Sequence, residues 1–267
     1  MSILKLQRKK ESAGTIEIKN KTEKEADLYF YGDIVSESWI TEWESDAQCP
    51  KTVADFLSEL KDVEKIHIYF NSGGGDVFAG LAIAQQLKRY KAEKIGHIDG
   101  LAASIAGVML MESCDIIIAP QNAMFMMHKP LCRCYGNAND FKKQIEILDK
   151  CQETILNAYM SKAKEGITNE QITELINKET WLTGKEMEDY FQVQLEGEIQ
   201  MTASCNSTYY DYYKKVPFAF KNSKKEEPEE IERFANLLAE KLKNMLQPQK
   251  SEKEKRKEEI LRGLDRI

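Results

Sequence analysis

Residues 65–76 read KIHIYFNSGGGD, a β-branched and aromatic run that passes directly into asparagine, serine and three glycines. Such a run is typical of a buried strand, and the glycines predict a tight turn after it. A helix is predicted next, because Val77, Leu81, Ala84 and Leu87 recur at the spacing of one helix face. This succession of strand, glycine loop and helix predicts an α/β fold.

The same succession recurs on both sides of this stretch. Strand-like and helix-like runs alternate up to residue 130, which favours a parallel sheet with covering helices. The predicted strands cover 26–31, 95–98 (which ends at Asp99-Gly100), 115–119 and 123–127, and the predicted helices cover 52–60 and 103–111.

The second half of the chain begins with a long helix, predicted over 139–165 and stopped by Gly166. Two capping boxes predict further helices, which extend to about 176 and 191. They are formed by Thr168 with Gln171 and by Thr183 with Glu186. Residues 193–220 are predicted to be β-like or irregular and contain a cluster of tyrosines.

Composition divides the chain into four segments. Residues 1–26 are polar and charged and are predicted to be a flexible N-terminal segment. Residues 27–195 hold the alternating elements and form one domain, and 196–221 form an irregular or β-like connector. From residue 222 a charge run precedes apolar residues spaced 4-3-4-3, so 222–267 is predicted to be a charged, coiled-coil-like helical extension.

The composition also argues against several classes of function. The formal net charge is -6, so we expect no nucleic-acid binding, which needs clustered Lys and Arg. No apolar run is long enough for a membrane helix, and residues 1–14 lack the apolar stretch of a secretory signal. The 6 cysteines are scattered as in a reduced cytosolic protein. Cys132 and Cys134 have no second ligand pair, so no metal site is predicted.

Three strand ends carry residues suited to chemistry. They are glycines 73–75, Ser104 and His128, and the carboxyl ends of parallel strands meet at one edge of a sheet. Ser104 begins a helix among small neighbours, where free N–H groups and the helix dipole could stabilise an oxyanion. Ser104 is equally suited to cap that helix, and the residues alone leave the two roles open. The surrounding sequence is not the G-x-S-x-G motif of α/β-hydrolases.

His128 is the candidate base for a serine nucleophile. It ends its predicted strand, whereas His67 and His97 lie inside strands and suit packing roles. A polar strand terminus is the alternative role of His128. The glycine loop could direct N–H groups at a substrate or cradle a phosphate, but it matches neither nucleotide-binding glycine motif.

Taken together, three stretches resemble the peptidase subunit of the Clp protease. NSGGGDVFAG (71–80) is similar to that family's N-S-P-G-G stretch, DGLAASIAG (99–107) to its nucleophile segment and MMHKP (126–130) to its M-I-H-Q-P. The resemblance covers about residues 27–195. Within the family, DGLAAS and ETWLT (179–183) are most similar to the Clp-like head maturation proteases of tailed phages and prophages.

The resemblance implies a crotonase-like fold of stacked ββα (βαβ) units, with 139–165 as a handle helix used in contacts between rings. It also implies that Ser104 is the nucleophile and His128 its base. The family's aspartate falls two residues before an aromatic-Leu-Ser/Thr stretch, and Glu179 occupies that place here. The remaining matched positions are the two oxyanion-hole donors, Gly75 and Ile105, and the substrate loop, Gly73 and Gly74. Gly73 replaces the family's proline, which loosens the loop.

The function expected from this resemblance is that of a serine endopeptidase without a cofactor. The first hypothesis is a head maturation protease, a homo-oligomeric ring (a heptamer or stacked rings) that cleaves capsid or scaffold protein in the host cytoplasm or at the prohead. The alternative is an ATP-dependent Clp proteolytic subunit supplied by an AAA+ unfoldase. A non-catalytic shell protein has no need for the Ser104–His128 pair, and an enoyl-CoA hydratase-like enzyme would use acidic residues instead.

Overall fold

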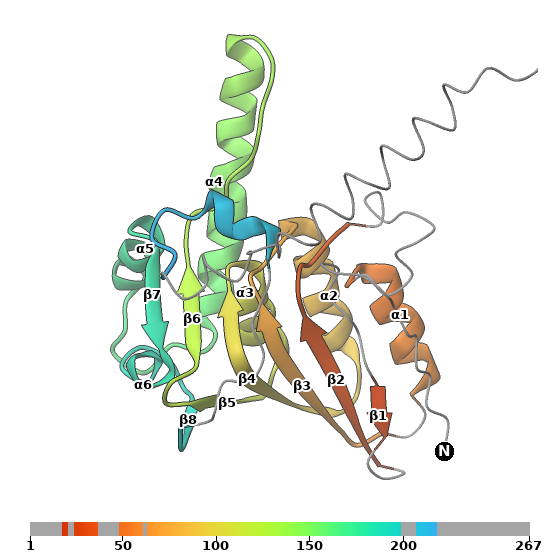
Figure 1. The fold of residues 1–267 in the computed structure, drawn as a ribbon. Coiled ribbons are helices and arrows are strands. Elements are labelled where there is room, and N and C mark those ends of the chain that lie inside the picture. Colours follow the sequence, from red (N-terminus) through yellow and green to blue (C-terminus); the bar gives the residue numbers. More distant parts are fainter. Residues whose placement is uncertain (1–17, 21–23, 37–47, 61–62, 199–206, 218–267) are drawn as a thin grey trace, which may run out of the picture. The chain divides into compact units, whose positions relative to one another are not determined.

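The computed structural model describes residues 18–20, 24–36, 48–60, 63–198 and 207–217. Within them, one sheet has the strand order β1-β2-β3-β4-β5-β8, and β6 joins it by pairing with β4 and β7 (Figure 1). The strands are β1 (Ile18–Asn20), β2 (Glu25–Tyr31), β3 (Lys65–Ser72), β4 (Glu93–Ala103), β5 (Ile116–Pro120), β6 (Met124–Met127), β7 (Thr180–Thr183) and β8 (Gln194–Glu196).

Helices connect most of these strands. They are α1 (Pro50–Glu59), α2 (Val77–Arg89), α3 (Ile105–Ser113), α4 (Ala138–Met160), α5 (Asn169–Asn177), α6 (Gly184–Met187) and the 3-10 helix η2 (Thr208–Tyr212). The pairs β2–β3, β3–β4 and β4–β5 are parallel, so the predicted parallel sheet with helices is confirmed. β1 pairs antiparallel with β2, so the sheet begins inside the segment 1–26 that was predicted to be flexible.

The strand β4 is longer than the predicted 95–98. It continues through Asp99-Gly100 to Ala103 because each half has its own partner. Residues 95–97 pair with β5, and residues 101–103 pair with β6. The sheet therefore branches along β4, and the second branch carries the chain to Ser104.

The core lies between the sheet and α1 to α4. Residues 105–111 of α3 are all buried, which explains why this part of the helix is apolar on every face rather than on one. The buried face of α2 is centred on Ala79, Ile83 and Leu87, while Val77 and Leu81 are only partly buried. The predicted helical spacing was therefore correct, but the face that is actually buried is rotated slightly around the helix axis from the predicted one.

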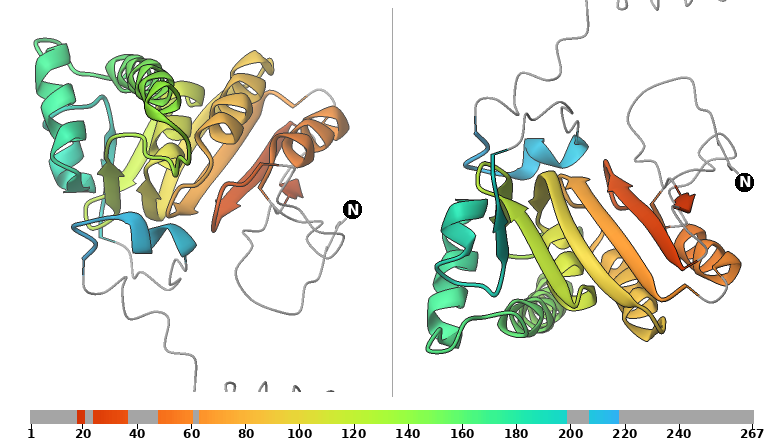
Figure 2. Two further views of the ribbon diagram at one scale, coloured as in Figure 1. Left: turned by 90° about the horizontal axis from the view of Figure 1, so that it is seen from above. Right: turned by 90° about the horizontal axis from the view of Figure 1, so that it is seen from below.

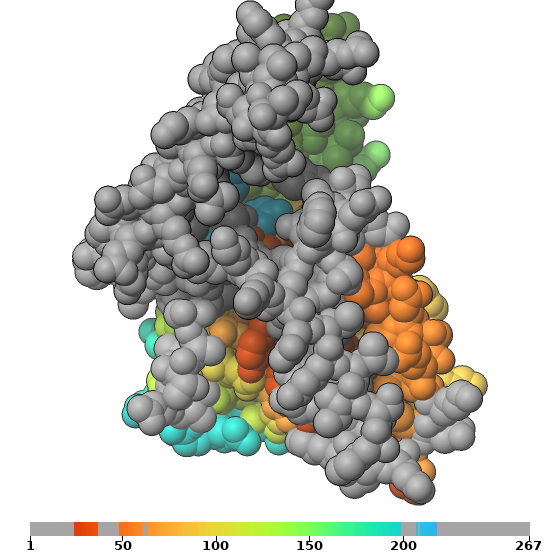
Figure 3. Space-filling model, turned by 45° about the vertical axis from the view of Figure 1, so that its right-hand side comes forward, coloured from red at the N-terminus to blue at the C-terminus, as the bar shows by residue number. Residues whose placement is uncertain are grey.

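The long helix is shorter than predicted. α4 ends at Met160 rather than near 165, because Ser161 already closes it, and Gly166 turns the chain five residues later with a φ of +89°. Figure 3 shows part of α4 as exposed surface, in green. Phe141 and Ile145 are 46% and 57% exposed on the first half of this helix, so these two apolar side chains are not buried by the described fold.

The two predicted capping boxes are present, at Thr168 with Gln171 and at Thr183 with Glu186. The helix after Thr183 is a single turn that ends at Met187, well before residue 191. The predicted extension 222–267 lies outside the described residues. In the part of the chain that the structure describes, no helix is long and apolar enough to cross a membrane.

Residues 207–217 form a strap, which begins with η2 and belongs to the predicted connector. Figure 2 shows it on the side of the sheet opposite to α2, α3 and α4. Its buried side chains Tyr210, Tyr213 and Val216 form a second small core with Leu101, Ala103 and Met126. The strap therefore covers the ends of β4 and β6.

Candidate active site

The sheet register brings the candidate catalytic residues together. Ala103 of β4 pairs with Met126 of the parallel strand β6, so both strands end at the same level. Ser104 directly follows β4, and His128 directly follows Met127, the last residue of β6. β7 runs antiparallel to β6 and pairs Thr180 with Met127, so the next position in each strand sets Glu179 opposite His128.

Ser104 has a strained backbone that aims its side chain away from the helix. Its φ is 55° and its ψ is -126°, and its side chain makes no capping hydrogen bond to α3. Its Oγ instead lies 2.8 Å from the Nε2 of His128. Among the described residues, Ser104 and Glu179 are the two with a positive φ that are not glycine. Backbone strain of this kind persists where the surrounding structure holds it, often at functional sites.

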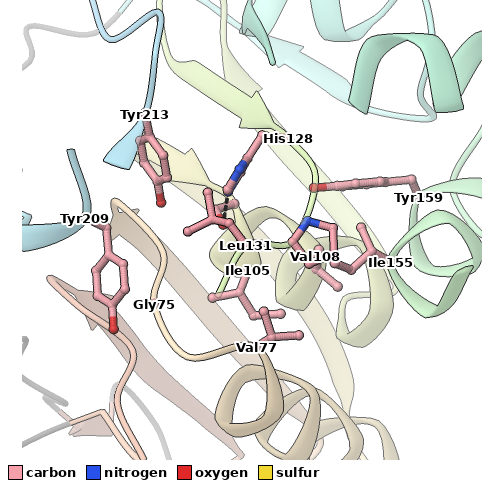
Figure 4. A pocket seen from close by; sticks show the side chains of 12 residues that line it. Gly75, Val77, Ile105, Val108, His128, Leu131, Ile155, Tyr159, Tyr209 and Tyr213 are labelled. Atoms are coloured by element: carbon pink, nitrogen blue, oxygen red, sulfur yellow. Dashed lines mark hydrogen bonds between the residues drawn. The ribbon is translucent and has the colours of Figure 1, made fainter. Parts of the chain in front are cut away.

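The two residues matched to the oxyanion donors, Gly75 and Ile105, line the same pocket as Ser104. Ile105 is the first residue of α3, and the first N–H groups of a helix have no partner within it. The carbonyl of Gly74 accepts a hydrogen bond from the N–H of Ile34. Because a trans peptide directs its N–H opposite to its C=O, the N–H of Gly75 points away from Ile34. Gly75, Ile105 and Ser104 all line one pocket (Figure 4).

The pocket is small and largely apolar away from Ser104 and His128. Its volume is about 60 Å³, which holds only a few water molecules. Figure 4 shows Ile155 and Tyr159 on one side of it and two strap residues, Tyr209 and Tyr213, on the other. The pocket thus joins the predicted nucleophile to a part of the chain about 100 residues away in sequence.

His128 is a neutral imidazole at neutral pH. Burial lowers its pKa to about 4, and the negative charge of Glu179 raises it against that larger effect. A neutral imidazole can accept the proton of the Ser104 hydroxyl through Nε2. The protonated form that would follow is disfavoured by the same burial.

Glu179 is held by the strap. It is buried, and its carboxylate accepts hydrogen bonds from the backbone N–H groups of Lys214 (2.9 Å) and Lys215 (2.5 Å). Glu179 and His128 both lie in the described part of the chain, and no hydrogen bond joins their side chains. The structure thus brings Ser104, His128 and Glu179 to one site, but only the first two are in hydrogen-bond contact.

The low pKa of His128 predicts a loss of stability in acid. Between its ordinary value of 6.5 and about 4, the unfolded chain binds a proton that the folded protein does not, so unfolding becomes more favourable as the pH falls. At about 1.4 kcal/mol per pKa unit, the free energy of unfolding should fall by about 3 kcal/mol through this residue. Urea unfolding of the protein and of His128→Gln at pH 7 and pH 4 measures the difference. An equal loss in both would contradict the low pKa.

Some site residues had no clear sequence signal. Asp33 is buried and accepts a hydrogen bond from the Ser207 hydroxyl at 2.5 Å, across 174 positions of sequence. Tyr213 belongs to the tyrosine cluster noted in the sequence, but its place at the site is seen only from its contacts with Gly73 and His128 in the folded protein. A tyrosine cluster beyond the last predicted helix was the one signal that could have drawn attention to this segment.

The remaining candidates stay outside the site. His67 and His97 lie side by side on β3 and β4, with Nδ1 and Nε2 3.0 Å apart, in a packed row of aromatic rings. Cys132 and Cys134 are exposed free thiols. Within the described ranges, no three His, Cys, Asp or Glu side chains gather as a metal site requires.

Comparison with known proteins gives one family. The family model described as Clp protease matches residues 28–193. The chain is 33% identical over 126 residues to the ATP-dependent Clp protease proteolytic subunit 3 of Rhodococcus jostii, covering 47% of this chain and 61% of that protein. It is 30% identical over 142 residues to proteolytic subunit 1 of Streptomyces coelicolor, covering 52% and 64%.

A plant relative shows similar identity. The chloroplastic ATP-dependent Clp protease proteolytic subunit 1 of Arabidopsis thaliana is 30% identical over 142 residues, covering 52% of this chain and 71% of that protein. The matched stretch spans less than two thirds of the length of the two bacterial relatives. All three names describe ATP-dependent proteolytic subunits, so the comparisons favour the alternative of the sequence analysis over a head maturation protease.

Proposed function

The chain belongs to the Clp protease family, and from this premise we propose that it is a serine peptidase in which Ser104 is the nucleophile. The observation that carries the proposal is the 2.8 Å contact between Ser104 Oγ and His128 Nε2. Gly75 and Ile105, whose N–H groups are the proposed oxyanion donors, line the same pocket as this contact. A serine, a base and paired N–H donors are the parts that acyl transfer requires.

The proposed reaction begins when His128 accepts the Ser104 proton and Oγ attacks the carbonyl carbon of the peptide bond. The carbonyl oxygen becomes an oxyanion, which the N–H groups of Gly75 and Ile105 stabilise. His128 then donates the proton to the leaving amine. A water molecule, activated by the same imidazole, hydrolyses the acyl-enzyme and restores Ser104.

Glu179 is the proposed orienting acid. Its place opposite His128 in the β6–β7 register supports this role, because an acid at Nδ1 holds the imidazole in the required tautomer. Its carboxylate must first leave the N–H groups of Lys214 and Lys215 or accept a further hydrogen bond. Gly73 and Gly74 are assigned to the loop that contacts the substrate backbone.

For partners, we propose a homo-oligomeric ring that receives unfolded protein from an ATP-driven unfoldase. The names of the relatives support the ATP-dependent role, and the exposed apolar side chains Phe141 and Ile145 on α4 support assembly with other copies. Head maturation, based on the resemblance of DGLAAS and ETWLT, becomes the second candidate.

A degradation assay separates the two candidates. With an AAA+ unfoldase and ATP, the protein should degrade a folded substrate, and without either component it should cleave only short peptides, because a folded chain cannot enter a narrow site. Light scattering of the same samples should show an oligomer. ATP-independent cleavage of a co-expressed coat or scaffold protein would favour head maturation. No cleavage of any peptide or protein, by the wild type or by a folded variant without the Tyr213 side chain, would refute the peptidase.

A further inference from the structure

The strap lies where a peptide substrate would have to bind. Tyr213 donates a hydrogen bond from its hydroxyl to the carbonyl of Gly73 at 2.5 Å, and its ring centroid is 4.8 Å from that of His128. Burial raises the pKa of its phenol, so Tyr213 is a neutral hydrogen-bond donor to the loop, and it lines the same pocket as Ser104. Figure 4 shows it beside His128 at the edge of the pocket.

The strap is fixed at both ends. At its start, the Ser207 hydroxyl donates to Asp33, and both residues are buried. Near its end, the N–H groups of Lys214 and Lys215 donate to the carboxylate of Glu179. Hydrogen bonds to a charged acceptor are stronger than those between neutral groups, so these two contacts hold the strap firmly.

Between these ends, the strap is packed rather than merely attached. Tyr210, Tyr213 and Val216 are buried against Leu101, Ala103 and Met126, the residues that lead into Ser104 and His128. Apolar burial of this extent gives the strap a defined position over the site. A segment that touched the site by chance would not bury every third side chain in this way.

Three consequences oppose catalysis while the strap is in place. The carbonyl of Gly73, a group of the proposed substrate loop, is already bonded to Tyr213. Tyr209 and Tyr213 of the strap line the pocket beside Ser104, so their side chains take up space next to the nucleophile. Both oxygens of Glu179 accept from the strap, and His128 makes no hydrogen bond to that carboxylate.

We propose that residues 207–217 are an autoinhibitory strap, which blocks the peptide site with Tyr213 and withdraws Glu179 from His128. This inference rests on the peptidase function proposed above. Displacement of the strap opens the pocket, releases the Gly73 carbonyl and frees the Glu179 carboxylate to accept a hydrogen bond from His128 Nδ1. One segment thus controls access to the site and the orientation of its base.

The rate at which a fluorophosphonate probe labels Ser104 tests the strap in the full-length protein. Tyr213→Ala removes the side chain that fills the site, and Ser207→Ala removes the first attachment without touching the pocket. Each should increase the labelling rate by at least ten-fold. The matched control is Tyr212→Ala, because Tyr212 is an exposed neighbour whose hydroxyl only accepts a hydrogen bond from Arg133.

Thermal unfolding identifies the variants that fold, and mass spectrometry locates the label. If Tyr213→Ala does not fold, the labelling rate of Ser207→Ala alone tests the strap. Labelling of the wild type at the same rate as the folded strap variants would overturn the autoinhibitory role of the strap without affecting the proposed peptidase function. Absence of label on Ser104 in the wild type and in every folded variant would overturn the peptidase itself. A ten-fold gain in Tyr212→Ala as well would also overturn the specific role of Tyr213.

Discussion

Replacing Ser104 with alanine should lower the rate of peptide hydrolysis by on the order of 10³-fold or more, because the acyl-enzyme can no longer form. The fold should survive the change. The Ser104 hydroxyl makes no capping bond to α3, so its loss leaves the helix start unaltered, and the contact that disappears is the one to His128. Hydrolysis of a short fluorogenic peptide measures the rate, and circular dichroism checks the fold.

A second serine on the same helix provides the control. Ser113 is also buried, but its hydroxyl donates to the carbonyl of Met109 at the far end of α3. Ser113→Ala should therefore leave hydrolysis within about two-fold of the wild type, since it removes only a local hydrogen bond of about 1 kcal/mol. A large residual rate in Ser104→Ala with the same cleavage products would refute the assignment of the nucleophile.

Replacing Gly75 with alanine should lower kcat by about 10²-fold or more. A Cβ at this position would lie 1.9 Å from the carbonyl oxygen of Ile34, and the φ of +153° is itself unfavourable for a side chain. Neither backbone can remain in place, so the N–H of residue 75 must move away from the position proposed for the oxyanion. Loss of one oxyanion donor typically costs 10²- to 10³-fold in kcat.

A substitution at Gly166 is the control that distinguishes the loss of the oxyanion donor from the effect of backbone strain alone. It also has a positive φ, of +89°, but a Cβ there would meet no atom within 4 Å. Gly166→Ala should lower the free energy of unfolding by about 1 kcal/mol and leave kcat unchanged, because only the conformational preference is lost. Steady-state kinetics of both variants provide the comparison. A Gly75→Ala protein that keeps more than a tenth of the wild-type kcat would argue against this N–H as an oxyanion donor.

Local sequence patterns were a reliable guide where an element is specified by its own residues. The run KIHIYF and the glycines after it predicted β3 and its loop, and the two capping boxes predicted the starts of α5 and α6. These signals are local because dihedral preference, side-chain alternation and capping act within a few residues. The three motif stretches likewise indicated Ser104 and His128 as the candidate nucleophile and base.

The predicted ends of helices and strands were wrong where contacts with a distant segment determine the end of the element. β4 extends to Ala103 because β6 pairs with its second half, and a glycine that would otherwise end a strand is carried through. α4 ends at Met160 although its pattern continues toward residue 165, and the chain that follows bonds to a distant segment instead, through Lys164 N–H to the carbonyl of Tyr190. In both cases contacts outside the element outweigh the local preference, which is worth only fractions of a kcal/mol per residue.

The sequence by itself determined the alternation of strands and helices and the residue types that chemistry needs at three strand ends. Only the tertiary structure decided that Ser104 faces His128 rather than capping α3, and that Glu179 bonds to Lys214 and Lys215. The same is true of the strap, whose contacts with Asp33 and Gly73 span 174 and 140 positions. Such contacts depend on the sheet register and on packing between distant segments, and no periodicity within either segment encodes them.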